Sequence, residues 1–228
     1  MEISPVVRTA VSDVVFASLV DEILSGRTAP GAAIPSEREL ALAFGVNRHA
    51  VREALKRVQQ AGLVSIAQGG KTRVQDWQRH AGLDVLVALT TSGAVPAKTL
   101  IRDVAVMRAV VGADAARWCA RNATEAEIAA VVAAAEAFPT GEVDPAELAA
   151  IDLVFWEAVV DGSHNVAYRL GLNTLVAGLM EMGYEHVEGL YAEQTDRASH
   201  VRLAGLIAAR DEAGARQLAE TLMFPKDV

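Results

Sequence analysis

Residues 35–74 read PSERELALAFGVNRHAVREALKRVQQAGLVSIAQGGKTRV, and this stretch decides the fold of the first part of the chain. Ser36 and Glu39 have the spacing of a capping box, in which the two side chains bind backbone N–H groups at the start of a helix. Gly45 is expected to end that helix, because glycine adopts the left-handed turn conformation at no steric cost. Asn47 is a favoured N-cap for a second helix. Two helices joined by a tight turn are therefore predicted.

The second predicted helix has an apolar face and a cationic face. Its expected core residues recur at helical spacing and are Val51, Leu55 and Val58. Three basic or titratable residues fall near its start and away from that face: Arg48, His49 and Arg52. Gly62 is expected to end the helix. In helix-turn-helix proteins the N-terminal part of the second helix enters the major groove of DNA.

Two short apolar runs follow, at residues 63–66 and 72–74, and they can pair as a hairpin whose tip is Gln68 to Lys71. An earlier helix over residues 11–24 is predicted from the spacing of its apolar residues. Three helices followed by a β-hairpin form a winged helix-turn-helix, which is a module that reads DNA.

The distribution of charge favours a nucleic-acid partner, although the net charge does not. The chain has 228 residues and a formal net charge of −8. Residues 38–73 contain seven Lys or Arg and two Glu, which gives 7 − 2 = +5 and leaves −8 − 5 = −13 for the remainder. A basic head can approach phosphate groups while an acidic body is repelled by them.

The rest of the chain predicts packed helices. Hydrophobic residues make up 52% of the chain and aromatic residues only 5%, so the core is expected to consist mostly of Ala, Val and Leu. About six helices are expected, with breaks near residues 122–124, 139–141, 162–165, 189 and 210–211. The predicted fold is mostly α: a winged helix-turn-helix domain at 1–76, a connector at 77–97 that contains Trp77, and an all-α helical bundle at 98–228.

The single cysteine, Cys119, excludes an intrachain disulfide. The N-terminus has no basic segment ahead of an apolar stretch, and the apolar runs are interrupted by charge. A cytoplasmic protein with no membrane partner is therefore expected.

An enzyme is the first alternative to a DNA-binding protein. Cys119 has no nucleophile elbow and no adjacent histidine, so a buried helical cysteine is favoured over a catalytic one. Gly69 and Gly70 lack the loop-to-helix context of a phosphate-binding loop. We therefore expect no enzyme. A second alternative is a nonspecific architectural DNA-binding protein, which would show little preference between an operator and a random duplex.

Residues 35–40 and 45–55, together with Gly62–Leu63 and the glycine-containing hairpin tip, resemble the DNA-binding head of the GntR family of bacterial transcription regulators, specifically its FadR-type subfamily. Asp152 ahead of Phe155–Trp156 resembles the all-α effector domain of that subfamily. The resemblance extends over almost the whole chain. It implies a homodimer that binds a palindromic operator in double-stranded DNA and a small-molecule effector in the C-terminal ligand-binding and dimerisation domain.

The resemblance also implies DNA contacts. Arg38, Arg48 and Arg52 match arginines that reach bases and phosphates, and Asn47 and His49 occupy neighbouring positions. Gln68, Gly69 and Lys71 belong to the wing tip, which enters the minor groove. An arginine fork suits guanine O6 and N7, and a glycine lets the backbone approach phosphate. For Lys56 and Arg57 we favour a solvated surface charge or a nonspecific phosphate contact.

Many effector domains of this subfamily hold a metal ion with one Asp and three His. Asp152 and His200 match two of those positions here, but Trp156 and Leu222 stand at the other two. One Asp and one His make a poor metal site, and the Trp156 ring would fill its volume. No metal is therefore expected.

The fatty-acyl-CoA-responsive members of the subfamily also lack the histidine cluster, and their connector resembles residues 68–86 of this chain. The final helix of this chain is shorter than theirs. The resemblance implies that no cofactor is needed and that DNA affinity falls when a long-chain fatty acyl-CoA binds. Four residues are the candidates for effector binding: Arg108, Asp152, Trp156 and His200. The alternative effector is a small carboxylate held by Arg108, with or without a metal.

Overall fold

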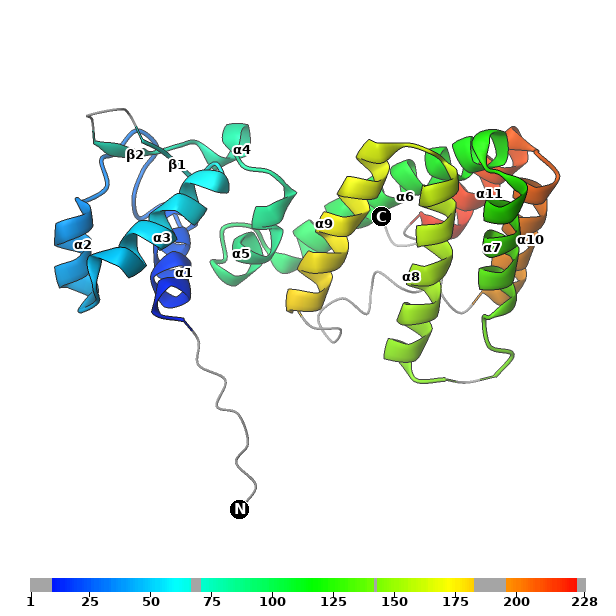
Figure 1. Cartoon of the computed structure of the whole chain (residues 1–228), viewed down its shortest axis with the longest axis horizontal. Helices are drawn as coiled ribbons and strands as arrows, with labels where there is room; N and C mark the ends of the chain where they lie inside the picture. The colour runs from blue at the N-terminus through cyan, green and yellow to red at the C-terminus, as the bar shows by residue number, and fades with distance from the viewer. Residues whose placement is uncertain (1–9, 67–70, 142, 183–195, 225–228) are drawn as a thin grey trace, which may run out of the picture. The chain divides into compact units, whose positions relative to one another are not determined.

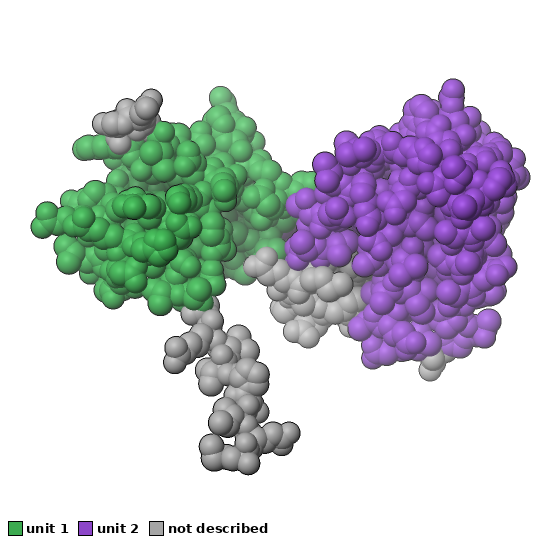
Figure 2. All heavy atoms as spheres, in the orientation of Figure 1, with its two compact units in different colours: residues 1–97 green, residues 98–228 purple. Residues whose placement is uncertain are grey.

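The computed structural model describes residues 10–66, 71–141, 143–182 and 196–224. The chain divides into two compact units, residues 1–97 and residues 98–228, which are coloured separately in Figure 2. The first unit contains three helices and a β-hairpin followed by short helical segments, and the elements of the second unit within its described residues are all helices (Figure 1). The predicted fold class, mostly α with a winged helix-turn-helix head, is confirmed.

The head begins with α1 (Val11–Leu24), α2 (Glu37–Phe44) and α3 (Arg48–Gln60). Strands β1 (Val64–Ile66) and β2 (Thr72–Val74) then pair antiparallel. In that pairing Val64 lies opposite Val74 and Ile66 lies opposite Thr72. The predicted wing strands are therefore present, while the predicted tip residues Gln68 and Gly69 lie outside the described residues.

Local side-chain bonds set the ends of α2 and α3. The Glu39 carboxylate accepts from the Ser36 backbone N–H at 2.8 Å, and the Ser36 hydroxyl oxygen accepts from the Glu39 backbone N–H at 3.3 Å. Gly45 follows α2 with φ of 66°, in the left-handed region that glycine tolerates best. Asn47 Oδ1 then accepts from the Ala50 N–H at 2.9 Å. The capping box, the turn and the N-cap predicted from the sequence are all confirmed.

The core of the head lies between α1 and α3. The predicted core face of α3 is buried, with Val51 and Val58 fully inaccessible to solvent. Val15 and Leu19 of α1 are buried in the same unit. Burying such aliphatic side chains stabilises a fold by roughly 1.5–3 kcal/mol each, so this apolar contact sets the orientation of α3.

Residues 77–97 form three short helical segments. These are α4 (Trp77–His80), a 3₁₀ turn η1 (Leu83–Val85) and α5 (Leu86–Thr91). Helix α5 contacts α1, and Val85 and Leu89 are buried there. The segment therefore clusters with the head in the first compact unit.

The second unit contains α6 (Ala97–Asn122), α7 (Glu125–Glu136), α8 (Pro145–Gly162), α9 (Val166–Met182), α10 (Arg197–Ala208) and α11 (Glu212–Met223). The breaks between α6 and α9, and the break between α10 and α11, fall where the sequence predicts them. The predicted break near residue 189 lies outside the described residues. Side-chain caps start several of these helices; the Thr124 hydroxyl, for example, accepts from the Glu127 N–H.

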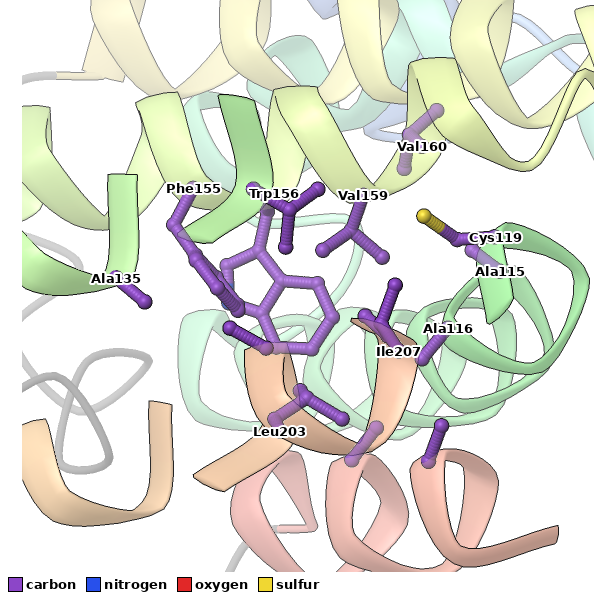
Figure 3. Packing of buried hydrophobic residues seen from close by; sticks show 14 of the residues in the cluster. Ala115, Ala116, Cys119, Ala135, Phe155, Trp156, Val159, Val160, Leu203 and Ile207 are labelled. Atoms are coloured by element: carbon purple, nitrogen blue, oxygen red, sulfur yellow. The ribbon is translucent and has the colours of Figure 1, made fainter. Parts of the chain in front are cut away.

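Small residues bring these helices close together. Ala115, Ala116 and Cys119 of α6 are fully buried and face the larger side chains of the other helices, as Figure 3 shows. Phe155 and Trp156 of α8 fill the middle of this core (Figure 3). Helix α7 packs against both α8 and α10. Within the described part of the chain, no helix is both long and apolar enough to cross a membrane.

Candidate DNA interface and effector core

The N-terminal half of α3 presents two arginines to solvent. Arg48 and Arg52 lie one helical turn apart and are both exposed, and the buried face of the helix lies on its other side. Arg38 is exposed on α2, the helix that precedes the turn. The three arginines that the sequence predicts to contact DNA are thus held on α2 and α3, with their guanidinium groups outside the core.

Arg52 is bound to Glu37 of α2. Arg52 Nε donates to Glu37 Oε1 at 3.1 Å, and Arg52 Nη2 donates to Oε2 at 2.8 Å. The bonded Arg52 guanidinium holds the pKa of the Glu37 carboxyl below its usual value, and the charges of Arg48 and Lys56 lower that pKa further. Sequence reasoning missed Glu37 as part of the site, because its place in the first turn of α2 gave only a helix-start signal.

Three other predicted contact residues make no side-chain hydrogen bond or ion pair with the described residues: Arg38, Arg48 and Lys71. All three are exposed. His49 is also exposed at the start of α3. Asn47 uses its Oδ1 as the helix cap, which leaves its NH₂ group available to a ligand.

The cations further along α3 have partners within the head. Lys56 Nζ donates to Glu53 Oε1 at 2.9 Å. Arg57 forms an ion pair with Asp13 of α1, and its guanidinium carbon lies 4.2 Å from the centre of the Phe16 ring. These contacts favour a structural role for Arg57 and agree with its separation from the predicted DNA contacts.

In the second unit, Asp152 and His200 lie together in the core. His200 Nε2 is 3.3 Å from Asp152 Oδ1, and His200 Nδ1 is 2.8 Å from the Asp196 carbonyl oxygen. A carbonyl only accepts hydrogen bonds, so Nδ1 carries a proton. Nε2 therefore faces the Asp152 carboxyl, and each group is a hydrogen-bond partner of the other. The histidine is fully buried and the aspartate is 2% exposed.

Aromatic rings surround this pair. The Phe138 ring stacks on the His200 imidazole with a centroid distance of 4.1 Å, and the Phe155 ring meets it edge-on at 5.0 Å. Both imidazole nitrogens have partners within the protein, and the ring contacts two aromatic side chains. No group of three or more His, Cys, Asp or Glu is arranged to hold a metal ion within the described residues.

Trp156 lies one turn after Asp152 on α8, and its ring is 4% exposed. Its indole Nε1–H has no hydrogen-bond partner among the described residues. An ideal Cβ at Gly112 of α6 would lie 3.4 Å from Trp156 Cζ3 and 2.3 Å from Met223 Sδ. The indole thus packs close to Gly112 of α6, in the same core cluster as Met223 of α11. Leu222, which stands at a ligand position of the metal-binding pattern, is also buried on α11.

Arg108 lies on α6 one turn before Gly112 and is partly buried. Residues four apart share a helix face, so Arg108 lies on the α6 face that meets Trp156. The structure therefore brings Asp152, Trp156 and His200 into one core region. Arg108 lies on α6, one helical turn before the glycine that packs against Trp156.

Cys119 is buried in the same bundle. Burial, with a smaller contribution from the charge of Glu127, raises the pKa of its thiol to about 12. A thiol in that state is protonated at neutral pH and is a weak nucleophile. This agrees with the structural role predicted for Cys119.

Comparisons with known proteins agree with this geometry. The family model "Bacterial regulatory proteins, gntR family" matches residues 11–74, and the FCD domain model matches residues 103–223. The HTH-type transcriptional regulator Mce2R of Mycobacterium tuberculosis is 34% identical over 229 residues, covering 98% of this chain and 92% of that protein. The fatty acid metabolism regulator protein of Edwardsiella ictaluri is 30% identical over 192 residues, covering 84% of this chain and 79% of that protein.

One similar solved structure is described as "Lar controls the expression of the Listeria monocytogenes agr system and mediates virulence". It matches with a TM-score of 0.56 and 15% identity, covering 95% of this chain and 94% of that chain. At that identity the likeness shows the fold alone. The two family models and the full-length relative carry the assignment further: the chain belongs to the GntR family of DNA-binding transcriptional regulators, in the FadR subfamily with an FCD domain, and it is not an enzyme.

Proposed function

We propose that this regulator acts as a homodimer on a palindromic operator and that a long-chain fatty acyl-CoA, bound in the second unit, lowers its affinity for DNA. The observation that supports operator reading is the exposed pair Arg48 and Arg52 at the start of α3. Arginine forks at this part of a helix-turn-helix reach guanine O6 and N7 in the major groove. Arg38, Asn47, His49 and the wing residues Gln68, Gly69 and Lys71 are proposed to add base and phosphate contacts.

The chemistry of the second unit supports an organic effector over a metal ion. His200 and Asp152 satisfy each other, and the indole of Trp156 stands at a position where metal-binding relatives have a histidine. The Trp156 N–H is buried without an acceptor in the part of the chain that the structure describes, and an unpaired buried donor costs roughly 1–3 kcal/mol. A carbonyl or similar acceptor on a ligand would remove that cost, because it would give the N–H a partner.

A fatty acyl-CoA combines the two kinds of group that this region needs. Its thioester carbonyl is an acceptor for Trp156, and its alkyl chain suits a core built from Ala, Val and Leu. The guanidinium of Arg108, on the same side of α6, is proposed to meet the anionic part of the ligand. Relatives named fatty acid metabolism regulator protein, at 30% identity, also favour this ligand class.

The test is an isothermal titration calorimetry experiment in which palmitoyl-CoA, kept below its critical micelle concentration, is titrated into the full chain. Free coenzyme A serves as the control for the headgroup, and palmitate serves as the control for the chain. Binding of palmitoyl-CoA, weakened in Trp156→Phe, is the expected result. No heat at high micromolar palmitoyl-CoA would reject the acyl-CoA effector and leave the DNA-binding function standing.

A small carboxylate is the second candidate effector, because Arg108 can bind a carboxylate bidentately. A thermal-shift screen of mono- and dicarboxylic acids on the full chain would identify it. The expected signature is a rise in melting temperature that Arg108→Gln abolishes. A rise that survives in Arg108→Gln would reject Arg108 as the anchor.

A further inference from the structure

We infer that Glu37 is a specificity-determining residue of the DNA-binding head, which orients the Arg52 guanidinium for base reading and restrains it from binding phosphate. The inference rests on the proposed operator-reading role of α3 and assigns to the Glu37 carboxylate a function that is exerted through Arg52. It is carried by the side-on ion pair between Glu37 at the start of α2 and Arg52 on α3.

The geometry of the pair leaves the reading edge of Arg52 open. A guanidinium has five N–H donors, and Glu37 takes one from Nε and one from Nη2. The remaining 5 − 2 = 3 donors include the outer N–H groups of Nη1 and Nη2. These two point in parallel along the end of the side chain, which is the arrangement that matches guanine O6 and N7.

The pair also reduces the conformational freedom of Arg52. A free arginine samples many rotamers and loses that freedom when it binds, whereas a side chain already held in place loses less. The Glu37 side chain is itself fixed at the N-terminus of α2, where a helix favours negative charge. Because the capping box at Ser36 and Glu39 fixes this end of α2, the carboxylate is presented to α3 from a defined position.

The charge of Glu37 acts on selectivity in a second way. A phosphate contact depends mainly on positive charge and carries no sequence information. Glu37 neutralises much of the local charge of Arg52, and it also lies in the field of Arg48. The pair therefore weakens attraction to any duplex and preserves the hydrogen-bond donors that distinguish one base pair from another.

The head contains a matched control for this effect. Glu53 is an exposed carboxylate on α3 that pairs with Lys56, so Glu53→Gln changes the net charge by the same amount as Glu37→Gln. Lys56 lies one turn beyond Arg52. Loss of the Glu53 carboxylate should raise affinity for all duplexes alike and leave their ratio unchanged.

The experiment begins with a duplex selected from a randomised library by the wild-type full chain. The affinities for this duplex and for its scrambled version are then measured for the wild type, Glu37→Gln, Glu53→Gln, Arg52→Ala and the double variant Glu37→Gln/Arg52→Ala. Glu37→Gln should lower the ratio of the two affinities about tenfold, in the range set by one bidentate base contact. It should also steepen the salt dependence on the scrambled duplex by about one unit of slope.

Glu53→Gln should leave the ratio unchanged, and Glu37→Gln should have no further effect on the ratio when Arg52 is absent. If Glu37→Gln leaves the ratio of the affinities for the selected and scrambled duplexes unchanged, the inference is overturned. It is also overturned if Glu37→Gln lowers this ratio equally in the wild-type background and in the Arg52→Ala background. A wild-type chain that selects no preferred duplex would instead reject sequence-specific reading, so the two failures are distinguishable. Melting temperatures of the variants check that each remains folded.

Discussion

His200 on α10 and Asp152 on α8 form a hydrogen-bonded pair in the core of the second unit, with 3.3 Å between Nε2 and Oδ1. The two residues are 48 positions apart in the sequence, and their contact ties α10 to α8. The pair is enclosed by the rings of Phe138 and Phe155. Both partners are buried, so each depends on the other to satisfy its polar atoms.

The first prediction concerns this pair. Asp152→Ala leaves the buried imidazole without a partner for Nε2 and should lower the free energy of unfolding by roughly 3–5 kcal/mol. Asp152→Asn should cost much less, because an amide N–H can donate to the Nε2 of a neutral histidine whose proton stays on Nδ1. Urea denaturation of both variants measures the difference. Equal losses would show that the hydrogen bond contributes little.

A metal ion should not stabilise the second unit. His200 Nδ1 faces a carbonyl, Nε2 faces Asp152, and Trp156 and Leu222 offer no ligand atoms. Zinc or manganese would have to displace these contacts. We expect the melting temperature to be the same after dialysis against EDTA and after addition of either ion at equimolar concentration. A metal-dependent rise in melting temperature that occurs in the wild type and is lost in His200→Gln would contradict this expectation.

The pH dependence of stability should include a contribution from Cys119. Its folded pKa is raised to about 12 by burial, above the ordinary thiol value of 9.0. The folded state therefore keeps its proton while the unfolded state loses it, and this stability is fully present below pH 9 and is lost as the pH rises toward 12. The slope approaches about 1.4 kcal/mol per pH unit at its steepest. Cys119→Ala should lose less stability than the wild type between pH 9 and 11; parallel curves would argue against a buried thiol.

Gly162 should tolerate no larger residue. A Cβ at this position would lie 2.6 Å from Cys119 Sγ and 3.2 Å from Ala123 Cβ. Gly162→Ala should therefore separate α8 from α6 and destabilise the chain by about 1–3 kcal/mol. Gly205 in α10 is the control, since nothing lies within 4 Å of a Cβ there. Gly205→Ala should stabilise the chain by about 1 kcal/mol through helix propensity alone. Loss of stability in both variants would contradict this account.

The sequence correctly predicted the features that depend on residues close together along the chain, namely the helix ends and the buried face of α3. The ends of α2 and α3 follow from Ser36, Gly45 and Asn47, whose side chains or backbone act within a few positions, and the structure has them as expected. The buried face of α3 follows from the spacing of its apolar residues. Periodicity and capping are local signals, so they are readable without tertiary structure.

The features that escaped sequence reasoning join distant segments. Nothing in the local pattern shows that Glu37 binds Arg52 fifteen positions away, or that the Trp156 N–H finds no acceptor among the residues that the structure describes. The sequence pattern predicts a surface cation or a nonspecific phosphate contact at Arg57, whereas the structure pairs Arg57 with Asp13 and Phe16 of α1. Such contacts depend on how helices pack, which residue spacing along a single helix does not specify.

The most direct test of the central claim is the preference of the full chain for its selected duplex over a scrambled duplex at physiological salt. Arg48→Ala is compared with Lys56→Ala, because both remove one exposed cation from α3. The wild type should prefer the selected duplex about a thousandfold or more. Arg48→Ala should lose about tenfold or more of that preference, while Lys56→Ala should weaken both duplexes alike. A wild type without preference, or two variants with the same effect on the ratio, would contradict the account.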